Sequence, residues 1–322
     1  MNKIDLVYPC HAKDKETLEI CIKYACKNIK NLRNIYVVSK TKLTDSATWI
    51  SEDIFPFTFQ TMIDKIGNHN KTGWYYAGWI HLYSILCIPD ILDNVLICDA
   101  DTIFCKEVEF VNDLGQSLFN ISNGDGTALY LEHNQKVIPG LTNQLSGTLS
   151  CVCHHILINK TIMNDLVEKS EAIHKKPFWE LWIDVSKEQY NSCHFDNTYK
   201  GNERHKLGPG RVTSYELYGQ YALKYFPDKV KIRPLNSIFA YKGFLNIKNT
   251  DFTKSHKSRS NKGLVTIVPE NIEQSIVFDT FEECIEFHIT ECIKHDFTSV
   301  TFQNHTRQGS NKITGNGHGD KR

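Results

Sequence analysis

The chain has 322 residues, which is enough for one large α/β domain or two smaller domains with a substantial core. Lys plus Arg and Asp plus Glu number 37 each, so no bulk positive field favours nucleic acid or an anionic membrane. No segment approaches the about 18 consecutive apolar residues of a membrane span. These properties predict a soluble protein that recognises a small ligand, and they argue against a nucleic-acid partner or a membrane span.

The cysteines and the N-terminus bear on localisation. Eleven cysteines form an odd set, and most of them fall on predicted apolar faces, which is typical of free thiols in a reducing compartment. The apolar stretch at the N-terminus is too short for the core of a signal peptide and runs directly into a folding pattern. We therefore expect a cytoplasmic protein.

The first elements in chain order form a βαβ unit. Residues 4–9 are an apolar run, and residues 18–29 repeat apolar side chains at the i, i+3, i+4, i+7 spacing of a helix that faces a core. Residues 35–39 are a second apolar run, and residues 94–98 are a third. Strands joined through helices in this way are parallel and covered on both faces, so the sequence predicts an α/β protein.

The carboxyl ends of these predicted strands meet at one edge of the sheet. They lie at Tyr8, Pro9 and Cys10, at Ser39, and at the segment that begins with Asp99. Open α/β sheets bind ligands at that edge, so we expect a pocket there.

The remaining chain divides into further predicted elements. They are an apolar helix from Thr72 that Pro89 ends, a strand over 150–158, a helix over 162–173, a loop turning into a short aromatic helix over 175–182, an irregular loop over 191–211, a helix over 214–227, a surface excursion over 246–263, a helix over 279–292 and a strand over 299–302.

The tripeptide Asp99-Ala100-Asp101 follows the apolar run of residues 94–98 directly. Residues i and i+2 of an extended chain point the same way, so both carboxylates leave the sheet at its carboxyl edge. Two bare carboxylates would repel each other, so one of them must be protonated, hydrogen-bonded or facing a cation. Oxygen ligands suit hard cations, so the tripeptide predicts a site for Mn²⁺ or Mg²⁺.

The run from Val95 to Phe104 resembles the DxD segment of GT-A glycosyltransferases, in which an apolar strand delivers the aspartates that hold a metal and a nucleotide sugar. The wider series is similar to a poorly characterised family of DxD glycosyltransferases. That series comprises residues 4–11, 71–76, 96–104, 151–155, 174–180, 214–218 and 300–305.

The resemblance implies a fold and a domain arrangement. The expected fold is α/β of GT-A type: a single Rossmann-like, mostly parallel sheet flanked by helices, with a C-terminal extension. Residues 1–245 would bind the nucleotide sugar and carry the catalytic site, and residues 246–307 would pack back on it. Residues 308–322 would be a disordered tail.

The resemblance also implies an activity, which is metal-dependent transfer of a hexose from a nucleotide diphosphosugar, UDP-hexose by preference, to a hydroxyl on a glycan, a protein or a small molecule. Asp99, Asp101 and His305 would hold the metal. The donor would be bound by Tyr8, Pro9, Cys10, Ser39, Trp74, Tyr75, Asp99, Ala100 and Asp101. Asp101 is also a candidate catalytic residue.

The segment Cys151-Val152-Cys153-His154-His155 has two interpretations. Alternation along a strand would put Cys151, Cys153 and His155 on one face and His154 on the other, so a closed zinc site would need ligands from elsewhere. No second pair of ligands at zinc-finger spacing follows. We favour His154 and His155 as sugar- or acceptor-binding residues, with a hydrogen-bonded core as the alternative.

Glu216 lies just inside a predicted helix N-terminus, which favours its ionised form. The resemblance implies that this segment lies beside the donor, where Glu216 could act as a general base on the acceptor or stabilise the developing cation, and this choice would decide between inversion and retention. The alternative role is complementarity to the helix dipole. Trp179 and Trp182, next to Pro177, are the better candidates for sugar stacking, and the alternative for these two residues, as for Trp74 and Tyr75, is a place in the core.

Two other functions compete with sugar transfer. Metal-bound aspartates at a sheet edge also serve nucleotidyl transfer, but that chemistry favours a glycine-rich phosphate loop, and the segment from Pro9 to Ala12 is not one. The second alternative is an inactive glycan- or nucleotide-binding protein. The joint presence of both aspartates, His305 and Glu216 argues against it. The residues do not specify the acceptor or the oligomeric state.

Overall fold

The structure is a computed structural model that describes residues 2–68, 72–123, 128–147, 149–193, 212–233, 237–240, 281–294 and 296–302. A five-stranded sheet lies at its centre, in the order β3-β2-β1-β4-β9. Its strands are β1 (Ile4–Pro9), β2 (Leu32–Ser39), β3 (Thr48–Ser51), β4 (Asn94–Cys98) and β9 (His155–Asn159). β1 to β4 run parallel, and β9 pairs antiparallel with β4.

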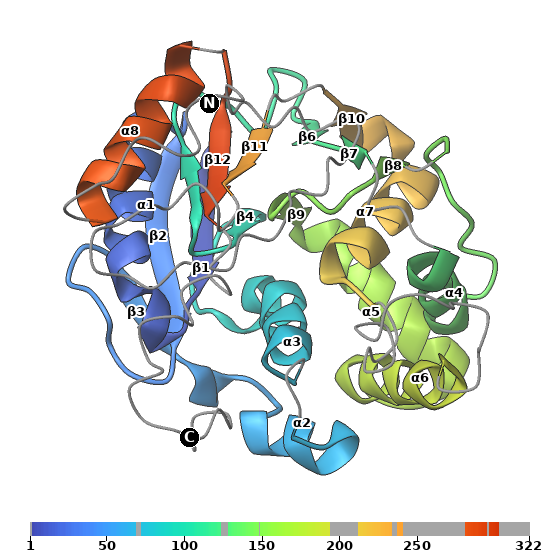
Figure 1. The fold of residues 1–322 in the computed structure, drawn as a ribbon. Coiled ribbons are helices and arrows are strands. Elements are labelled where there is room, and N and C mark those ends of the chain that lie inside the picture. The colour runs from blue at the N-terminus through green and yellow to red at the C-terminus, as the bar shows by residue number, and fades with distance from the viewer. Residues whose placement is uncertain are drawn as a thin grey trace, which may run out of the picture.

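Helices cover both faces of this sheet (Figure 1). They are α1 (Lys15–Asn28), α2 (Phe59–Ile66), α3 (Thr72–Cys87), α4 (Ala128–Val137), α5 (Lys160–His174), α6 (Phe178–Cys193), α7 (Ser214–Tyr225) and α8 (Phe281–Lys294). α1 and α8 lie on one side, and α3, α5 and α7 lie on the other. The predicted mixed α/β architecture, a mostly parallel sheet flanked by helices, is confirmed.

Strand alternation divides the interior into two cores. Leu6 and Tyr8 of β1 pack with Leu18 and Ile285 on the side of α1 and α8. Val7, between them, packs on the side of α3, α5 and α7. Successive side chains of a strand face opposite ways, so each strand contributes to both cores.

A smaller sheet lies next to the end of β4. It consists of β11 (Ser237–Ala240), β12 (Ser299–Phe302) and β5 (Thr102–Phe104), in that order. The hydroxyls of Thr102 and Thr301 are 2.9 Å apart, and the Phe302 N–H donates to the Asp101 carbonyl at 2.8 Å. The strand predicted over 299–302 is therefore present, and it pairs with the segment directly after Asp101.

Two short pairs of strands complete the described sheets. β6 (Ser117–Phe119) pairs with β10 (Val230–Ile232), and β7 (Ser122–Asn123) pairs with β8 (Leu149–Ser150).

Two predicted elements are corrected by the structure. The single strand expected over 150–158 is β8 and β9 separated by a bend, in which His154 has a left-handed φ of 59°. The alternation assumed for Cys151, Cys153 and His155 therefore does not apply. The short helix expected near residue 180 is instead α6, which runs from Phe178 to Cys193, so residues 191–193 are helical rather than irregular.

The strand order indicates the edge of the sheet at which a ligand is expected. The chain builds outward from β1 to β2 and β3, and then returns to place β4 on the other side of β1. In open α/β sheets, the crevice beyond the carboxyl ends of the strands at such a reversal is the ligand-binding position. Here Cys10 and Asp99 directly follow the two strands at that point.

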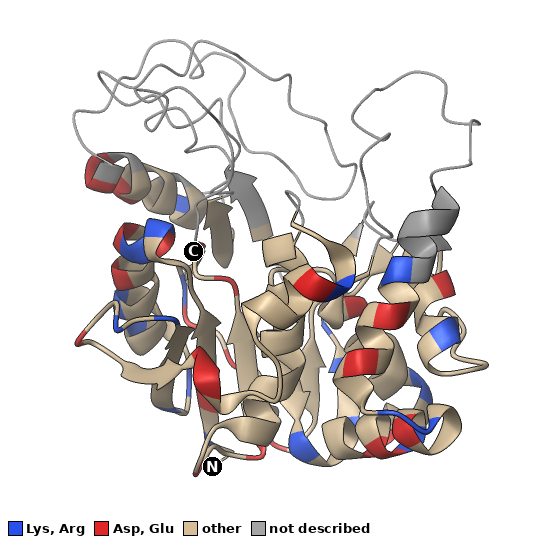
Figure 2. Cartoon of the chain, turned by 90° about the horizontal axis from the view of Figure 1, so that it is seen from below, with Lys and Arg blue, Asp and Glu red and all other residues tan. Residues whose placement is uncertain are grey.

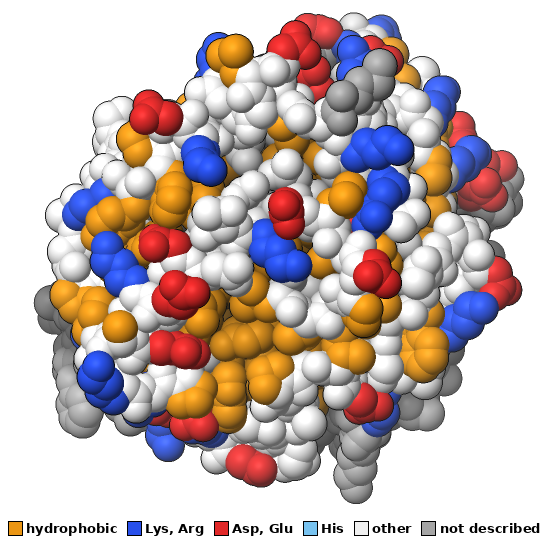
Figure 3. All heavy atoms as spheres, turned by 180° about the vertical axis from the view of Figure 1, so that it is seen from behind, with side chains coloured by type: hydrophobic (Ala, Val, Ile, Leu, Met, Phe, Trp, Pro, Cys, Tyr) orange, Lys and Arg blue, Asp and Glu red, His pale blue; other side chains and the backbone are white. Residues whose placement is uncertain are grey.

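The described surface carries both charge signs. Acidic and basic residues are interspersed in Figure 2, and Figure 3 shows hydrophobic side chains gathered between charged ones on the face opposite to that of Figure 1. Large hydrophobic side chains that are at least 39% exposed come from separate segments: Trp49, Ile54, Trp74, Leu114, Ile173, Ile232 and Ile293. Within the described segments, no helix combines the length and hydropathy that crossing a membrane requires.

Candidate functional site

Asp99 lies at the centre of a polar cluster just beyond β4. Its backbone N–H donates to the carbonyl of His154 at 2.9 Å, and its own carbonyl accepts from the Thr102 N–H at 3.1 Å. These two bonds fix the chain as it leaves the sheet. The side chain is 29% exposed, so the carboxylate is held in place and still reaches the surface.

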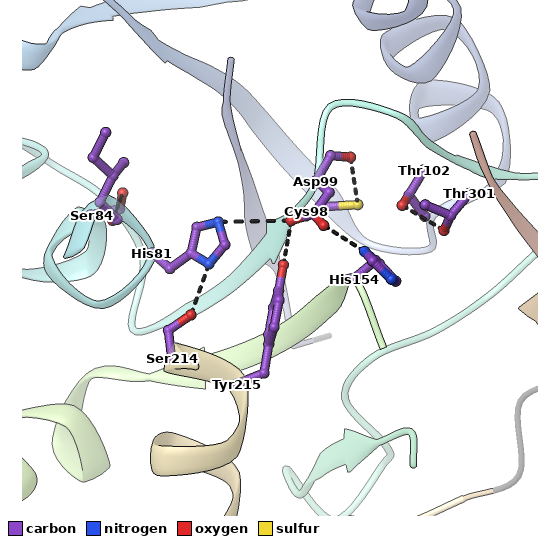
Figure 4. Close-up of polar contacts among 10 residues, drawn as sticks. His81, Ser84, Cys98, Asp99, Thr102, His154, Ser214, Tyr215 and Thr301 are labelled. Atoms are coloured by element: carbon purple, nitrogen blue, oxygen red, sulfur yellow. Dashed lines mark hydrogen bonds and ion pairs between the residues drawn. The ribbon is translucent and has the colours of Figure 1, made fainter. Parts of the chain in front are cut away.

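Three side chains approach this carboxylate from different directions (Figure 4). The Tyr215 hydroxyl donates to Oδ1 at 2.5 Å, and the His154 Nδ1 lies 2.7 Å from Oδ2. His81 Nε2 lies 3.8 Å from Oδ1. Helix α3 supplies His81, the bend before β9 supplies His154, and α7 supplies Tyr215, so the cluster joins three separate elements to the end of β4.

Opposing influences set the ionisation of Asp99. Burial is the largest, and it raises the pKa. The hydrogen bond and charge of His154, with smaller contributions from His81 and Tyr215, outweigh burial and leave the pKa of Asp99 below its ordinary value. The carboxylate is therefore ionised at neutral pH, and the groups around it must act as donors.

The two side chains that the helices supply are neutral at pH 7. Burial, followed by the charge of Asp99, raises the pKa of Tyr215 well above its ordinary value, so its hydroxyl keeps its proton. Burial also lowers the pKa of His81, although Asp99 opposes this effect. The other ring nitrogen of His81 lies 2.9 Å from the hydroxyl of Ser214, at the start of α7. Tyr215 thus holds Asp99 in place without cancelling its charge, and the neutral His81 borders the same oxygen.

Asp101 is half-buried and belongs to the same edge of the sheet. Its negative charge helps to raise the pKa of Cys10, after the larger effects of burial and Asp14. The ends of β1 and β4 are therefore electrostatically coupled. Ala100, between the two aspartates, is buried, and its carbonyl lies 3.4 Å from the thiol of Cys21.

Most of the other residues that were predicted to bind the donor lie in the core, and one of them is exposed. Tyr8 is fully buried with its hydroxyl directed to the Cys21 carbonyl, and Ser39 is 1% exposed with its hydroxyl on the Thr41 carbonyl. Cys10 and Tyr75 are also buried, Pro9 is half-buried, and Trp74 is 41% exposed. Among these side chains, Trp74 offers the most surface to a ligand, and the donor-binding role of the whole set stays a prediction.

The two adjacent histidines have different environments. His154 binds Asp99, whereas His155 is buried at the start of β9, between the rings of Phe104 and Phe110. The side-chain amide of Asn120 hydrogen-bonds to His155 Nε2. Burial, followed by the charge of Arg233, lowers the pKa of His155 to about 3. His155 is therefore a neutral core residue, the alternative left open above, and a sugar-binding role for it stays a prediction.

Trp179 and Trp182 both pack against the core between the helices. Trp182 is 1% exposed, and its ring lies so close to Gly78 that a Cβ there would meet it at 2.7 Å. Trp179 is half-buried, and its backbone carbonyl accepts from the indole N–H of Trp79. Sugar stacking by either ring stays a prediction, and Trp182 has no exposed ring face to support it.

Glu216 is enclosed within the protein. It is 1% exposed, and Oε2 accepts from both the Ser150 hydroxyl and the Cys151 N–H at 2.8 Å. Oε1 accepts from the side-chain amide of Gln220, also at 2.8 Å. Both oxygens are occupied inside the fold, so a catalytic role for Glu216 stays a prediction that this geometry does not support.

Metal ligation was expected to involve a third side chain, His305, which lies outside the described residues. Across the part of the chain that the structure describes, no group of three or more His, Cys, Asp and Glu side chains is arranged to hold a metal. This applies to the Cys151–His155 segment as well, where the zinc alternative has no support.

His81 and Tyr215 are site residues that sequence reasoning missed. His81 interrupts an otherwise apolar helix, and a polar residue within such a helix is the one signal that could have identified it. Tyr215 adjoins Glu216 in the segment 214–218, but successive helix residues point about 100° apart. Without the helix phase, either residue could have faced the end of β4.

Comparisons with known proteins find little similarity in sequence. No protein-family model matches the sequence, and no curated protein matches it significantly. Among solved structures, mouse xyloside xylosyltransferase 1 in its apo form is similar at 9% identity and a TM-score of 0.38, over 75% of this chain and 88% of that one. This likeness is too distant to indicate function, so the functional argument rests on the site.

Proposed function

We propose that this protein is a metal-dependent glycosyltransferase that moves a hexose from a nucleotide diphosphosugar, UDP-hexose by preference, to a hydroxyl acceptor. One observation carries the proposal: an ionised, partly exposed aspartate stands at the reversal point of a mostly parallel sheet, hydrogen-bonded to His154 and Tyr215 from two other elements. Asp101 follows two residues later at the same edge.

The charge of Asp99 supports a cation at this position. Among the described ion pairs, its partners are His81 and His154, with no lysine or arginine. A carboxylate has about four lone-pair positions, so Asp99 can accept a cation while it keeps its bonds to His154 and Tyr215. Asp99 and Asp101 therefore fit an oxygen-preferring divalent cation such as Mn²⁺ or Mg²⁺.

His305 is the proposed third ligand. It lies three residues beyond Phe302, whose N–H bonds to the Asp101 carbonyl. Three residues span at most about 10 Å, so the covalent chain permits a position of His305 near Asp101. An imidazole added to two carboxylates gives a mixed nitrogen and oxygen donor set, which favours Mn²⁺ over Ca²⁺. When bound, the cation would neutralise the departing nucleoside diphosphate.

The protein residues around the metal ligands have a positioning role in this proposal. His154 and Tyr215 fix the two oxygens of Asp99, so the carboxylate needs little rearrangement when it binds a ligand. His81 links α3 to α7 through Ser214 and holds the tyrosine side of the cluster in place. The sugar would lie beyond this edge, with the acceptor hydroxyl oriented toward its anomeric carbon.

Donor cleavage in the absence of acceptor tests the proposal. The protein is incubated with UDP-hexoses and GDP-mannose in Mn²⁺, in Mg²⁺ or in chelator, and the nucleotide products are separated by chromatography. We expect release of UDP that requires the divalent cation. Asp101→Asn, which is isosteric, should abolish it, whereas Asp113→Asn, the same change at an exposed loop position, should not.

The products separate sugar transfer from its alternatives. Release of pyrophosphate from nucleoside triphosphates, without UDP release from UDP-hexoses, would indicate a nucleotidyltransferase. Tight UDP binding with no turnover of any donor would indicate an inactive binding protein. Activity that Asp101→Asn leaves unchanged would place the site elsewhere.

A further inference from the structure

Glu216 and Gly219 attach α7 to the bend that carries His154. We name residues 149–154 the His154 turn. Glu216 receives two hydrogen bonds from it, one from the Ser150 hydroxyl and one from the Cys151 backbone, both at 2.8 Å. Ser150 in turn accepts from the Val152 N–H at 3.1 Å, so the carboxylate holds the start of the turn as a unit.

Gly219, one helical turn later, permits the close contact that these bonds require. A Cβ at this position would lie 2.4 Å from the Sγ of Cys151 and 2.6 Å from its Cβ. Real Cβ atoms do not approach other atoms so closely, so any larger residue would push the turn away from the helix. The backbone of α7 at Gly219 thus packs directly against the side chain of Cys151 in the turn. Glu216 hydrogen-bonds to the turn beside this contact.

The far end of the same turn is strained. His154 has a φ of 59°, a left-handed conformation that a non-glycine residue adopts at a cost of about 1–3 kcal/mol. In this conformation both its carbonyl and its imidazole reach Asp99, at 2.9 Å from the backbone nitrogen and 2.7 Å from Oδ2. Such a conformation persists only where surrounding contacts hold it.

We propose that Glu216 and Gly219 are positioning residues for Asp99. They clamp the His154 turn onto α7, the helix that also supplies Tyr215, and so bring the imidazole and the phenol to opposite oxygens of one carboxylate. One consequence of this clamp rests on the proposed function, namely that a displaced His154 weakens the binding of metal and donor. The clamp itself is a statement about the fold.

Two measurements on Glu216→Gln test the clamp. The first is NMR of ¹³C,¹⁵N-histidine-labelled protein, with His154 assigned by its loss in His154→Gln. A glutamine keeps one acceptor oxygen and replaces the other with an NH2 donor, which faces either the Gln220 amide or the Ser150 and Cys151 donors, so we expect the bonded group to rearrange and the His154 resonances to shift. The second is the affinity for UDP in Mn²⁺, which should fall roughly 10- to 100-fold, the usual effect of losing support for a metal ligand.

Gly219→Ala repeats the test with Glu216 intact. The added methyl group should displace Cys151 and produce the same two changes, and Ser150→Ala, which removes one donor, should produce weaker ones. Tyr221→Phe is the matched control, because it removes a hydrogen bond from the other side of α7, to Asp165. It should leave the His154 resonances and the UDP affinity unchanged. Ser150→Ala and Gly219→Ala keep the test decisive should Glu216→Gln fail to fold.

The possible outcomes are distinct. Unchanged His154 resonances and UDP affinity in Glu216→Gln, with sugar transfer reduced about 100-fold or more, would overturn the clamp and make Glu216 a general base. Unchanged resonances with only a lower melting temperature would also overturn it. Shifted resonances in a protein that binds no UDP, even as wild type, would support the clamp and reject the proposed function.

Discussion

Asp5 and Asp99 stand at opposite edges of one sheet, in β1 and directly after the neighbouring β4, and their carboxylates have different partners. Asp5 is fully buried near the start of β1 and accepts two bonds from the guanidinium of Arg33, at 2.9 and 2.5 Å. It also accepts from the backbone N–H groups of Asn34 and Leu92. A permanently charged guanidinium and two backbone amides therefore occupy both oxygens of this carboxylate.

Asp99 is 29% exposed, and its partners are two imidazoles and a phenol. None of these carries a permanent charge. The comparison shows that the amino edge of the sheet uses a carboxylate for stability, whereas the carboxyl edge holds one in position with its charge available. A carboxylate of the second kind is suited to bind a cation that arrives with a ligand.

The largest expected effect is on stability at the amino edge. Asp5→Asn removes the charge that pairs with Arg33, whose side chain is 30% exposed. Breaking a buried ion pair on one side leaves the other charge uncompensated, so we expect the free energy of unfolding to fall by about 3 kcal/mol. Urea denaturation measures this loss. Asp99→Asn, the same isosteric change at the carboxyl edge, should cost about 1 kcal/mol. Equal losses from the two variants would contradict the comparison.

Acid should destabilise the carboxyl edge. The pKa of His155 is about 3 in the folded protein, mainly through burial, against about 6.5 in the unfolded chain. Its contribution to stability is therefore complete above pH 6.5 and is lost as the pH falls toward 3, because only the unfolded state takes up the proton. Between pH 6.5 and 4.5 the loss should be about 2 kcal/mol.

His155→Gln isolates this contribution, because glutamine can keep the bond to Asn120 and does not titrate. Its free energy of unfolding, measured at both pH values, should depend on pH less steeply than that of the wild type. At the amino edge, the hydrogen bond to Asp5 raises the pKa of Arg33, so that guanidinium does not titrate in this range. A pH dependence unchanged by His155→Gln would show that the folded protein accepts a proton at this site.

A smaller stability effect than those of Asp5 and His155 comes from a single hydroxyl of α7. Tyr215→Phe removes the 2.5 Å bond to Asp99 and should lower the free energy of unfolding by about 1 kcal/mol. It should also weaken Mn²⁺-dependent UDP binding, because Asp99 loses one of its fixed donors. Tyr218→Phe, on the same helix, loses only a bond from the Asn159 N–H and should leave UDP binding intact. Equal UDP affinities in the two variants would remove Tyr215 from the site.

Sequence reasoning identified the strands that position the site because their signals are local. The apolar runs at 4–9 and 94–98 each form a strand. The candidate site residues lie at the carboxyl ends of these two strands, so their approximate position follows directly from the strand predictions. The same holds for the strand over 299–302, although its pairing with β5 is a contact between segments almost 200 residues apart, which no local pattern shows.

The polar cluster was only partly predictable for physical reasons. His154 lies in a segment that is β-like on both sides, and a left-handed conformation at a non-glycine residue leaves no mark in the sequence. Glu216 was the more conspicuous residue of α7, because a carboxylate near a helix N-terminus suggests chemistry. The fold instead turns Glu216 toward Ser150 and directs the adjacent Tyr215 to Asp99.

The central claim is that Asp99 holds a cation through which a nucleoside diphosphate binds. Calorimetric titration with UDP, in Mn²⁺ and in chelator, tests it most directly on the wild type and on Asp99→Asn. We predict binding to the wild type that requires Mn²⁺, and a loss of tenfold or more in Asp99→Asn. Equal UDP affinity in Mn²⁺ and in chelator, or an Asp99→Asn variant that binds as the wild type does, would contradict the account.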